Sequence, residues 1–428
     1  MQIYLDYSAT TPPRPEAVAA MQTILEQRWG NPSSLHEWGQ RAATALEQAR
    51  MQVAGLVNAN PDSIYFTSGG TEANNLAIFG VTQAYARPQH LIISSVEHSA
   101  IAEPARFLVQ QGWQVTWLPV DQQGRVHPLD LQAALKPNTV LVSAIYGQSE
   151  VGTLQPIEAL GRIAQAQGVL FHTDAVQVAG RLPIDLQHLP VDLMSFSSHK
   201  LYGPQGVGAL YVRPGVELVP LLWGGGQEMR LRSGTQALPA IAGFGVAAEL
   251  AAEEMAMETP RLIELRDRLF ELMSEVECLV PTGDRVHRLP HHVSFCVMPS
   301  SGQGSSLEKD VTGRSITEKN ITGKNITGKT IVRQLNLAGI GISAGSACHS
   351  GKLSPSPILS AMGYDEVAAL GGIRLTLGRQ TTVEDIDWTA LVLKQVLARL
   401  CEDHSGEEHS GHKFQTSVIS TSLDLETL

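Results

Sequence analysis

Short apolar runs alternate with segments of helical periodicity between residues 64 and 212. The runs lack polar alternation, which is typical of strands that are buried on both faces of a sheet. Strands separated by helices in this way predict a largely parallel sheet with helices on both sides, and ligands of such sheets lie at the carboxyl ends of the strands. We expect strands at residues 64–67, 90–95, 115–120, 140–145, 169–172, 193–196 and 208–212, and helices at 72–85, 99–110 and 157–167.

Other elements flank this alternating region. A short strand at residue 3 leads into a loop that two prolines stiffen, and helices are expected over 14–27 and 37–57. Beyond residue 234 the chain is mostly helical to about residue 276, followed by strands at 293–297, 340–343 and 373–377 and a closing helix over 383–400. Two mixed regions of unequal size predict a large domain and a smaller C-terminal one.

Two segments look like additions to this pattern. A polar pentad repeat with glycines occupies residues 311–330 and predicts a flexible insertion. The tail from Glu402 places His404, His409 and His412 among serine, glycine and glutamate, which predicts disorder. These histidines could bind a stray divalent metal, but we expect no metal site.

Residues 323–330 match the Walker A pattern of nucleotide-binding loops. The match arises inside the pentad repeat, and no apolar strand leads into it. A nucleotide triphosphatase using this loop would require ATP binding that Lys329→Ala abolishes, and we do not favour it.

The bulk composition narrows the classes of function. The chain has 428 residues, 43% of them hydrophobic, which allows two domains with sizeable cores. A formal net charge of -11 argues against direct nucleic-acid or anionic-membrane partners, and no apolar run is long enough to span a membrane. The start of the chain lacks signal-peptide features and the four cysteines are scattered, so we expect a cytoplasmic protein with reduced thiols.

Lys200 lies at the end of an expected strand, because an apolar run precedes it and a segment rich in glycine and proline follows. His199 and two serine hydroxyls flank it. Lysine amines react with carbonyl groups, including the aldehyde of pyridoxal phosphate (PLP). A lone lysine here would be an ordinary surface residue, so the PLP hypothesis depends on other residues.

Three further motifs follow expected strands. In the segment 67–72, glycines and a helix N-terminus could hold a phosphate, with the Thr71 hydroxyl adding a contact. Asp174 could pair with the pyridine nitrogen of PLP, and Gln177 could bond the ring hydroxyl. His98 could stack on an aromatic cofactor and transfer protons. Each motif alone is equally typical of a tight turn, a strand end or a loop.

Two C-terminal residues carry candidate substrate chemistry. Cys348 lies in a run of small residues that leaves a thiol accessible, and His349 beside it could help form the thiolate. Cys348 could also be an unreactive thiol. Arg374 follows two glycines on an alternating strand, where a guanidinium could clamp a carboxylate through two bonds or form a surface ion pair.

Together these motifs resemble the PLP-dependent cysteine desulfurases of the NifS/IscS type, within the class V aminotransferase family. The Ser-Ala-Gly-Ser-Ala-Cys form of the cysteine loop resembles the IscS/NifS branch. The similar stretches run in the family's order from residue 3 to about 400. They are Tyr4-Leu-Asp-Tyr-Ser-Ala-Thr-Thr-Pro, Gly30-Asn-Pro-Ser-Ser, Phe66-Thr-Ser-Gly-Gly-Thr-Glu, Glu97-His98, Asp174-Ala-Val-Gln177, Met194-Ser-Phe-Ser-Ser-His-Lys200, Arg232-Ser-Gly-Thr235, Ser343-Ala-Gly-Ser-Ala-Cys348 and Ile373-Arg374.

The resemblance implies an α/β protein with the fold type I of PLP-dependent transferases. A large domain with a mostly parallel seven-stranded sheet would be joined by a smaller α+β domain. We expect the N-terminal segment 1–13 to join the small domain, 14–255 to form the PLP-binding domain, and 256–401 to form the small domain, with a low-complexity insertion at about 301–329 and a disordered tail at 402–428. A homodimer is also implied.

The resemblance also assigns roles to single residues. Lys200 would hold PLP, Asp174 would pair with its ring nitrogen and His98 would stack on the ring. Lys200 or His98 would move the α-proton of L-cysteine. Cys348 would take the substrate sulfur as a persulfide, release alanine and pass the sulfur to an acceptor such as an iron–sulfur scaffold protein. Gly70, Thr71, Ser197, His199 and Thr235 of the other subunit would hold the phosphate, and Arg374 and Asn31 would bind the substrate carboxylate.

This chain departs from the family pattern at two positions. Gln148 stands where the family usually has the asparagine that contacts the ring hydroxyl of PLP, and Trp223 replaces a histidine before three glycines. Two other hypotheses therefore stay open. A selenocysteine lyase or another class V lyase would keep activity in Cys348→Ala, and a non-catalytic sulfur-carrier scaffold would lack the yellow absorbance of bound PLP.

Overall fold

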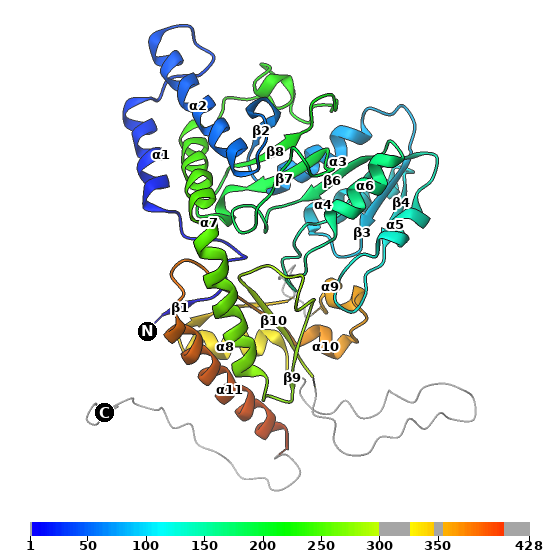
Figure 1. Ribbon diagram of the computed structural model, residues 1–428, viewed down its shortest axis with the longest axis vertical. Coiled ribbons are helices and arrows are strands. Elements are labelled where there is room, and N and C mark those ends of the chain that lie inside the picture. Colours follow the sequence, from blue (N-terminus) through cyan, green and yellow to red (C-terminus); the bar gives the residue numbers. More distant parts are fainter. Residues whose placement is uncertain (1, 299–325, 346–353, 406–428) are drawn as a thin grey trace.

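A seven-stranded sheet forms the centre of the larger part of the molecule (Figure 1). The computed structural model describes residues 2–298, 326–345 and 354–405. The strand order is β2-β8-β7-β6-β5-β3-β4, and β8 alone runs antiparallel to its neighbours. The predicted mostly parallel sheet is therefore confirmed. The strands are β2 (Ile64–Thr67), β3 (His90–Ser94), β4 (Gln114–Leu118), β5 (Thr139–Ser143), β6 (Leu170–Asp174), β7 (Leu193–Ser197) and β8 (Gly208–Val212).

Helices cover both faces of this sheet. Leu91 and Ile93 of β3 pack with α3 (Gly70–Thr82) and α4 (Ser99–Gln110), whereas Ile92 belongs to the core on the opposite face. Successive side chains of a strand point to opposite faces, so a strand between two helical layers must be apolar throughout. The other face is covered by α1 (Pro15–Gln27), α2 (Glu37–Leu56), α6 (Ile157–Ala166) and the first half of α7 (Leu238–Met273).

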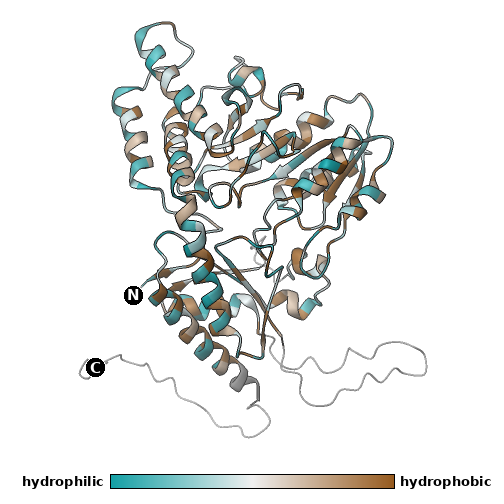
Figure 2. Ribbon diagram, viewed as in Figure 1, coloured by the Kyte–Doolittle hydropathy of each residue, from teal (hydrophilic) through white to brown (hydrophobic). Residues whose placement is uncertain are grey.

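A smaller layer packs at the far end of α7, which crosses from one part to the other (Figure 1). Its four-stranded sheet has the order β12-β13-β10-β9, and β1 (Ile3–Tyr4) pairs in parallel with β11 (Ile340–Gly341). Figure 2 shows β10 in the brown of hydrophobic residues, as its complete burial requires. The remaining elements are β9 (Leu279–Pro281), β10 (His292–Val297), β12 (Ser343–Ala344), β13 (Gly372–Thr376), α8 (Gly328–Leu337), α9 (Pro357–Ala361), α10 (Glu366–Leu370) and α11 (Val383–Ser405).

The structure differs from the sequence-based expectations at short elements. The strand expected at 340–343 is two strands, β11 and β12, in different sheets. Five α-helices or strands were not expected: β9, α5 (Pro128–Ala134), α8, α9 and α10. The closing helix continues to Ser405, past the expected start of the tail. His409, His412 and most of the pentad repeat lie outside the described residues.

The end of the Walker-like match forms ordinary helix structure. Thr327 caps α8 by accepting a hydrogen bond from the backbone N–H of Thr330. A Cβ at Gly328 would lie 2.1 Å from the carbonyl oxygen of Gly372, so this glycine permits close packing against β13. This packing gives the nucleotide-binding hypothesis no support. Within the described ranges, no helix is both long and apolar enough to cross a membrane.

The apolar stripe of α8 offers a test of the smaller core. Leu335 is fully buried, whereas Leu337 on the same helix is 78% exposed. We expect Leu335→Ala to lower the free energy of unfolding by about 2–5 kcal/mol, because it leaves a cavity in a packed core. We expect Leu337→Ala to change it by less than about 0.5 kcal/mol. Urea unfolding followed by circular dichroism would measure both, and equal effects would contradict the assigned packing.

Candidate active site

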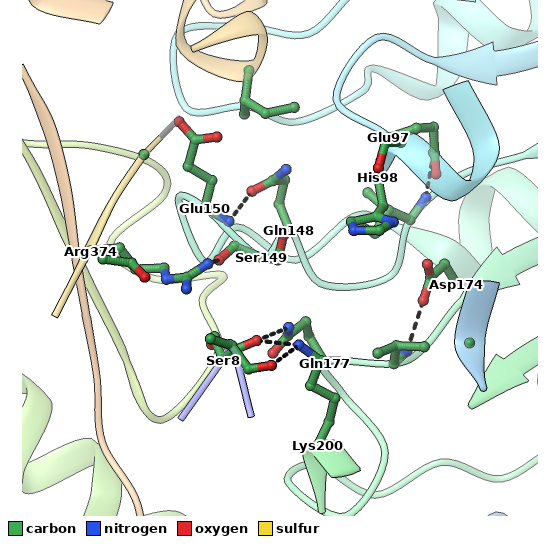
Figure 3. A pocket seen from close by; sticks show the side chains of 18 of the residues that line it. Ser8, Glu97, His98, Gln148, Ser149, Glu150, Asp174, Gln177, Lys200 and Arg374 are labelled. Atoms are coloured by element: carbon green, nitrogen blue, oxygen red, sulfur yellow. Dashed lines mark hydrogen bonds between the residues drawn. The ribbon is translucent and has the colours of Figure 1, made fainter. Parts of the chain in front are cut away.

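A cavity of about 650 Å³ opens where the strand ends of the large sheet meet β12 and β13 of the smaller one. Asp174 ends β6, Ser197 ends β7, and the N-termini of α3 and α4 contribute from the same edge. Carboxyl ends of parallel strands meet at one edge of a sheet, which is why residues far apart in sequence converge here. Figure 3 shows side chains that line the cavity, ten of them labelled.

Lys200 is held at the floor of this cavity by the N-terminal segment. Its ammonium nitrogen donates to the carbonyl oxygens of Ser8, at 2.5 Å, and Ala9, at 2.7 Å (Figure 3). The pKa of Lys200 is lowered to about 8, first by burial, because a charged ammonium loses its hydration there. The nearby positive charge of Arg374 contributes to the lowering of this pKa, because it repels a second cation. A substantial neutral fraction is thus available near neutral pH, and a neutral amine is the form that attacks an aldehyde.

Asp174 and Gln177 also line the cavity, and Gln177 lies beside Lys200 and Ser8 (Figure 3). Asp174 is 4% exposed, and its carboxylate accepts hydrogen bonds from the side chain of Asn74, at 2.7 Å, and the backbone of Val176, at 2.9 Å. The amide of Gln177 donates to the carbonyl oxygen of Ser8 at 2.9 Å, while its Oε1 is buried with no partner in the described structure. The acid is therefore fixed, and Gln177 has one acceptor oxygen without a hydrogen bond in the described structure.

The N-terminus of α3 provides an anion-binding end. Gly70 and Thr71 line the cavity with Ser197 and His199. A Cβ at Gly70 would lie 2.8 Å from a methyl group of Val176, so only glycine lets this helix start so close to the strand ends. Burial and the neighbouring Lys200 lower the pKa of His199 to about 4, so its ring, 3.1 Å from the Thr10 hydroxyl, is neutral at pH 7.

His98 and Glu97 lie at the start of α4. Nδ1 of His98 accepts a hydrogen bond from the backbone N–H of Ala100, which fixes the ring at the N-cap. The carboxyl of Glu97 is buried, and its Oε1 accepts from the Ser94 hydroxyl and the Ile145 N–H, each at 2.6 Å. Burial raises the pKa of Glu97 to about 8, so this acid is mostly protonated at pH 7.

Arg374 projects from β13 toward the cavity. Its guanidinium donates to the carbonyl oxygen of Ser149 at 2.9 Å and to the carboxylate of Asp6 at 2.7 Å. The other oxygen of Asp6 accepts from the Ser343 hydroxyl at 2.8 Å. Both partners of this ion pair are largely buried, so water screens it weakly.

Gln148 and Glu150 form one wall near Arg374. The side chain of Gln148 donates to the carbonyl oxygen of Val96 and accepts from the backbone N–H groups of Glu150 and Val151. Its amide is thus engaged in closing its own turn. Burial raises the pKa of Glu150 to about 7, against the opposing effects of Ser356 and Arg374.

Most of the predicted site residues share this cavity. Asn31 and Thr235 are exposed and do not line it, and neither does Trp223, which is 77% exposed. Cys348 and His349 lie outside the described residues. The cavity is lined by the predicted residues Gly70, Thr71, His98, Gln148, Asp174, Gln177, Ser197, His199, Lys200 and Arg374.

Sequence reasoning assigned no role to several residues that complete the site. Asp6 and Ser8 follow a two-residue strand, and their contacts with Arg374 and Lys200 span 368 and 192 residues of sequence, respectively. Glu97 and Glu150 are buried acids, whereas the sequence shows them only as loop residues. A carboxyl group between apolar strand ends is the signal that could have marked Glu97.

The donor set fits PLP. A buried lysine faces a fixed aspartate across the cavity, and a helix N-terminus with a neutral histidine and hydroxyls lies beside them. These groups suit an aldehyde, a protonated pyridine nitrogen and a phosphate, respectively. The unpartnered Oε1 of Gln177 leaves an acceptor for the ring hydroxyl.

Comparison with known proteins agrees with this chemistry. The family model for aminotransferase class V matches residues 3–306, so the chain belongs to this family of PLP-dependent proteins. Within it, the chain belongs to the cysteine desulfurases. It is 42% identical to cysteine desulfurase IscS of Dictyoglomus turgidum over 401 residues, which cover 93% of this chain and 95% of that protein.

Other relatives give the same result. Cysteine desulfurase IscS of Methanosarcina thermophila is 40% identical over 399 residues, covering 93% of this chain and 92% of that protein. A solved NifS-like protein superposes with a TM-score of 0.82 at 33% identity, covering 93% of this chain and all of that one. The expected fold, PLP cofactor and cysteine desulfurase activity are therefore confirmed, while the roles of single residues stay predictions.

The lowered pKa of Lys200 predicts how the apoprotein takes up PLP. Burial favours the neutral amine, so we expect the rate of PLP attachment to rise about tenfold per pH unit below pH 8 and to level off above it. Stopped-flow absorbance on mixing apoprotein with PLP would measure this. Lys200→Ala should show no attachment. A rate that keeps rising to about pH 10 would mean an amine with an unshifted pKa.

Proposed function

We propose that this protein converts L-cysteine to L-alanine by means of Lys200, His98, Asp174 and Cys348. The observation that carries the proposal is that Lys200, Asp174 and Arg374 line one cavity beside the N-terminus of α3. PLP, when bound there, supplies an electron sink for the α-carbon, and Asp174 keeps its ring nitrogen protonated. The protein's own residues then bind the substrate and move its protons.

Arg374 binds the substrate carboxylate, with N–H groups that remain beside its contacts to Ser149 and Asp6. The neutral amine of Lys200 is suited to take the α-proton, and His98 is held where its ring can exchange protons with the cavity. Asn31 lies outside this chain's own cavity, so its part in carboxylate binding would have to come from a partner subunit.

The sulfur step belongs to Cys348. Its thiolate would form a bond to the substrate sulfur, and the carbon–sulfur bond would break with its electron pair moving to carbon, which a proton completes as alanine. A thiolate of an acceptor protein, such as an iron–sulfur scaffold, would then attack the outer sulfur of the Cys348 persulfide. The acceptor would carry the persulfide, and Cys348 would be released as a thiolate. Support for Cys348 is its place in the sequence, three residues after Gly345 at the cavity wall.

A homodimer would complete the site. Six large apolar side chains are exposed on two loops and the start of α2, and we name them the apolar face: Trp29, Leu35, Trp38, Leu222, Trp223 and Met229. Exposed tryptophan and other large apolar side chains are typical of protein–protein contacts. Thr235 is exposed shortly after the second loop, as a residue that reaches a partner's phosphate site must be. A cytoplasmic location is part of the same proposal, supported by the scattered cysteines.

The sulfur step is tested by measuring alanine formed from L-cysteine in the PLP-loaded enzyme. We expect wild type to form alanine and Cys348→Ser to lose at least about 99% of the rate, because a hydroxyl cannot accept the sulfur. Equal alanine from both would favour a lyase that bypasses Cys348, such as a selenocysteine lyase. No alanine from either, despite yellow bound PLP, would contradict the proposed reaction.

The proposed role of the apolar face in the dimer is tested by placing a charged side chain on it. We expect Trp223→Glu to raise the dissociation constant of the dimer at least about tenfold, because it places an unpaired carboxylate in a desolvated contact. Val286→Glu, at a side chain that is 81% exposed in the smaller part of the molecule, is the control and should change nothing. Light scattering across a dilution series would measure both. An unchanged dimer in Trp223→Glu would exclude Trp223 from the interface.

A further inference from the structure

We infer that Asp6 is a positioning residue, which aims the guanidinium of Arg374 at the carboxylate of the amino-acid substrate. The inference rests on the proposed role of Arg374 in binding that carboxylate. Asp6 belongs to one of the stretches that resemble the family, but neither the residue pattern nor the resemblance gives it a role.

Both carboxylate oxygens of Asp6 accept a hydrogen bond, and the backbone beside Asp6 is held in place. One carboxylate oxygen accepts from Nη2 of Arg374 at 2.7 Å, and the other accepts from the Ser343 hydroxyl at 2.8 Å. The backbone beside Asp6 is pinned to β13, because Thr376 donates its N–H to the carbonyl oxygen of Leu5 at 2.8 Å. Asp6 and Arg374 are therefore held on neighbouring segments in a fixed register.

Arg374 needs Asp6 as a partner because a second carboxyl group, that of Glu150, competes for its guanidinium. Burial raises the pKa of Glu150 to about 7, so the carboxyl of Glu150 is about half protonated at pH 7. The positive charge of Arg374 acts to lower that pKa, so the two groups are near each other. If Asp6 were absent, the guanidinium would gain most by turning to Glu150, which would ionise. That movement would take the N–H groups of Arg374 away from the cavity. Within the described structure, Asp6 is the one carboxylate in an ion pair with Arg374.

Orientation and charge make opposite demands on substrate binding. As an acceptor, Asp6 fixes the plane of the guanidinium, which favours a bidentate carboxylate contact. As an anion, it offsets part of the positive charge that attracts the substrate. A carboxylate ligand needs the planar fork more than an additional fraction of charge, because N–H groups that point elsewhere cannot bind it at any charge. The oriented fork therefore decides the affinity.

Two substitutions separate these effects. Asp6→Asn keeps an oxygen that can accept from Arg374 but removes the charge, whereas Asp6→Ala removes both. We expect Asp6→Ala to raise the Kd of L-alanine, the reaction product, about tenfold in the PLP-loaded enzyme, as for the loss of one charge-assisted hydrogen bond. Asp6→Asn should stay within about threefold of wild type. Titration calorimetry with L-alanine would measure both, and KM for L-cysteine should follow Kd while kcat changes little.

A second readout follows the charge alone. Asp6 raises the pKa of Lys200, opposing the effect of burial, so removing its charge should lower that pKa. Both variants should therefore shift the pH midpoint of PLP attachment to the apoprotein below its wild-type value. The shift of the midpoint reports the loss of the Asp6 charge in either variant, whereas a rise of Kd in Asp6→Ala that Asp6→Asn does not share reports the positioning role.

The controls make the outcomes distinct. Asp387→Ala breaks another aspartate–arginine ion pair, a more exposed one with Arg268 at 2.6 and 2.7 Å on α7 and α11, and should leave Kd unchanged. If Arg374→Ala also leaves the Kd of L-alanine unchanged, the proposed carboxylate site is wrong. If Arg374→Ala weakens binding but Asp6→Ala does not, or if Asp6→Asn weakens it as much as Asp6→Ala, the positioning role of Asp6 is overturned.

Discussion

The site depends on one constraint: the N-terminal segment 3–11 must lie between the two parts of the molecule. On one side, β1 pairs with β11 and the Ser8 N–H donates to the Thr376 hydroxyl at 2.9 Å. On the other, the carbonyl oxygens of Ser8 and Ala9 hold the amine of Lys200, and the Thr11 hydroxyl donates to the carbonyl oxygen of His199. A few backbone groups thus set the distance between Lys200, the proposed site of PLP attachment, and Arg374, the proposed carboxylate ligand.

Burial then sets the protonation of the groups around that lysine. Desolvation lowers the pKa of Lys200 and of His199 and raises that of Glu97, so each shifts toward its neutral form. Asp174 is also buried, and its two oxygens accept hydrogen bonds from the side chain of Asn74 and the backbone of Val176. One cavity can therefore hold an anion for a ring nitrogen beside groups that exchange protons.

Secondary structure could be predicted from the sequence where the local pattern of apolar residues reflects the burial of the element. Strands 64–67 and 208–212 and helix 99–110 are observed as expected, because full burial and helical periodicity leave direct traces in the residue order. The short elements β9, α9 and α10 carry too few residues for such a trace. The partners of Asp6 could not be predicted, because register across β1, β11 and β13 depends on tertiary packing. Gln148 illustrates a different limit: its type suggested a weaker cofactor contact, whereas its side chain closes a turn.

The loop that carries Leu222, Trp223 and Met229 of the apolar face shows how a costly conformation can be maintained. Glu228, Met229 and Arg230 have φ of 46°, 52° and 69°, a region that costs non-glycine residues about 1–3 kcal/mol each. Glu228 offsets this strain, because its buried carboxylate accepts from Arg50, from the backbone of Phe66 and from Gln236. A strained loop anchored by one buried ion pair presents Trp223 and Thr235 outward in a fixed geometry, as an interface that completes another subunit's site requires.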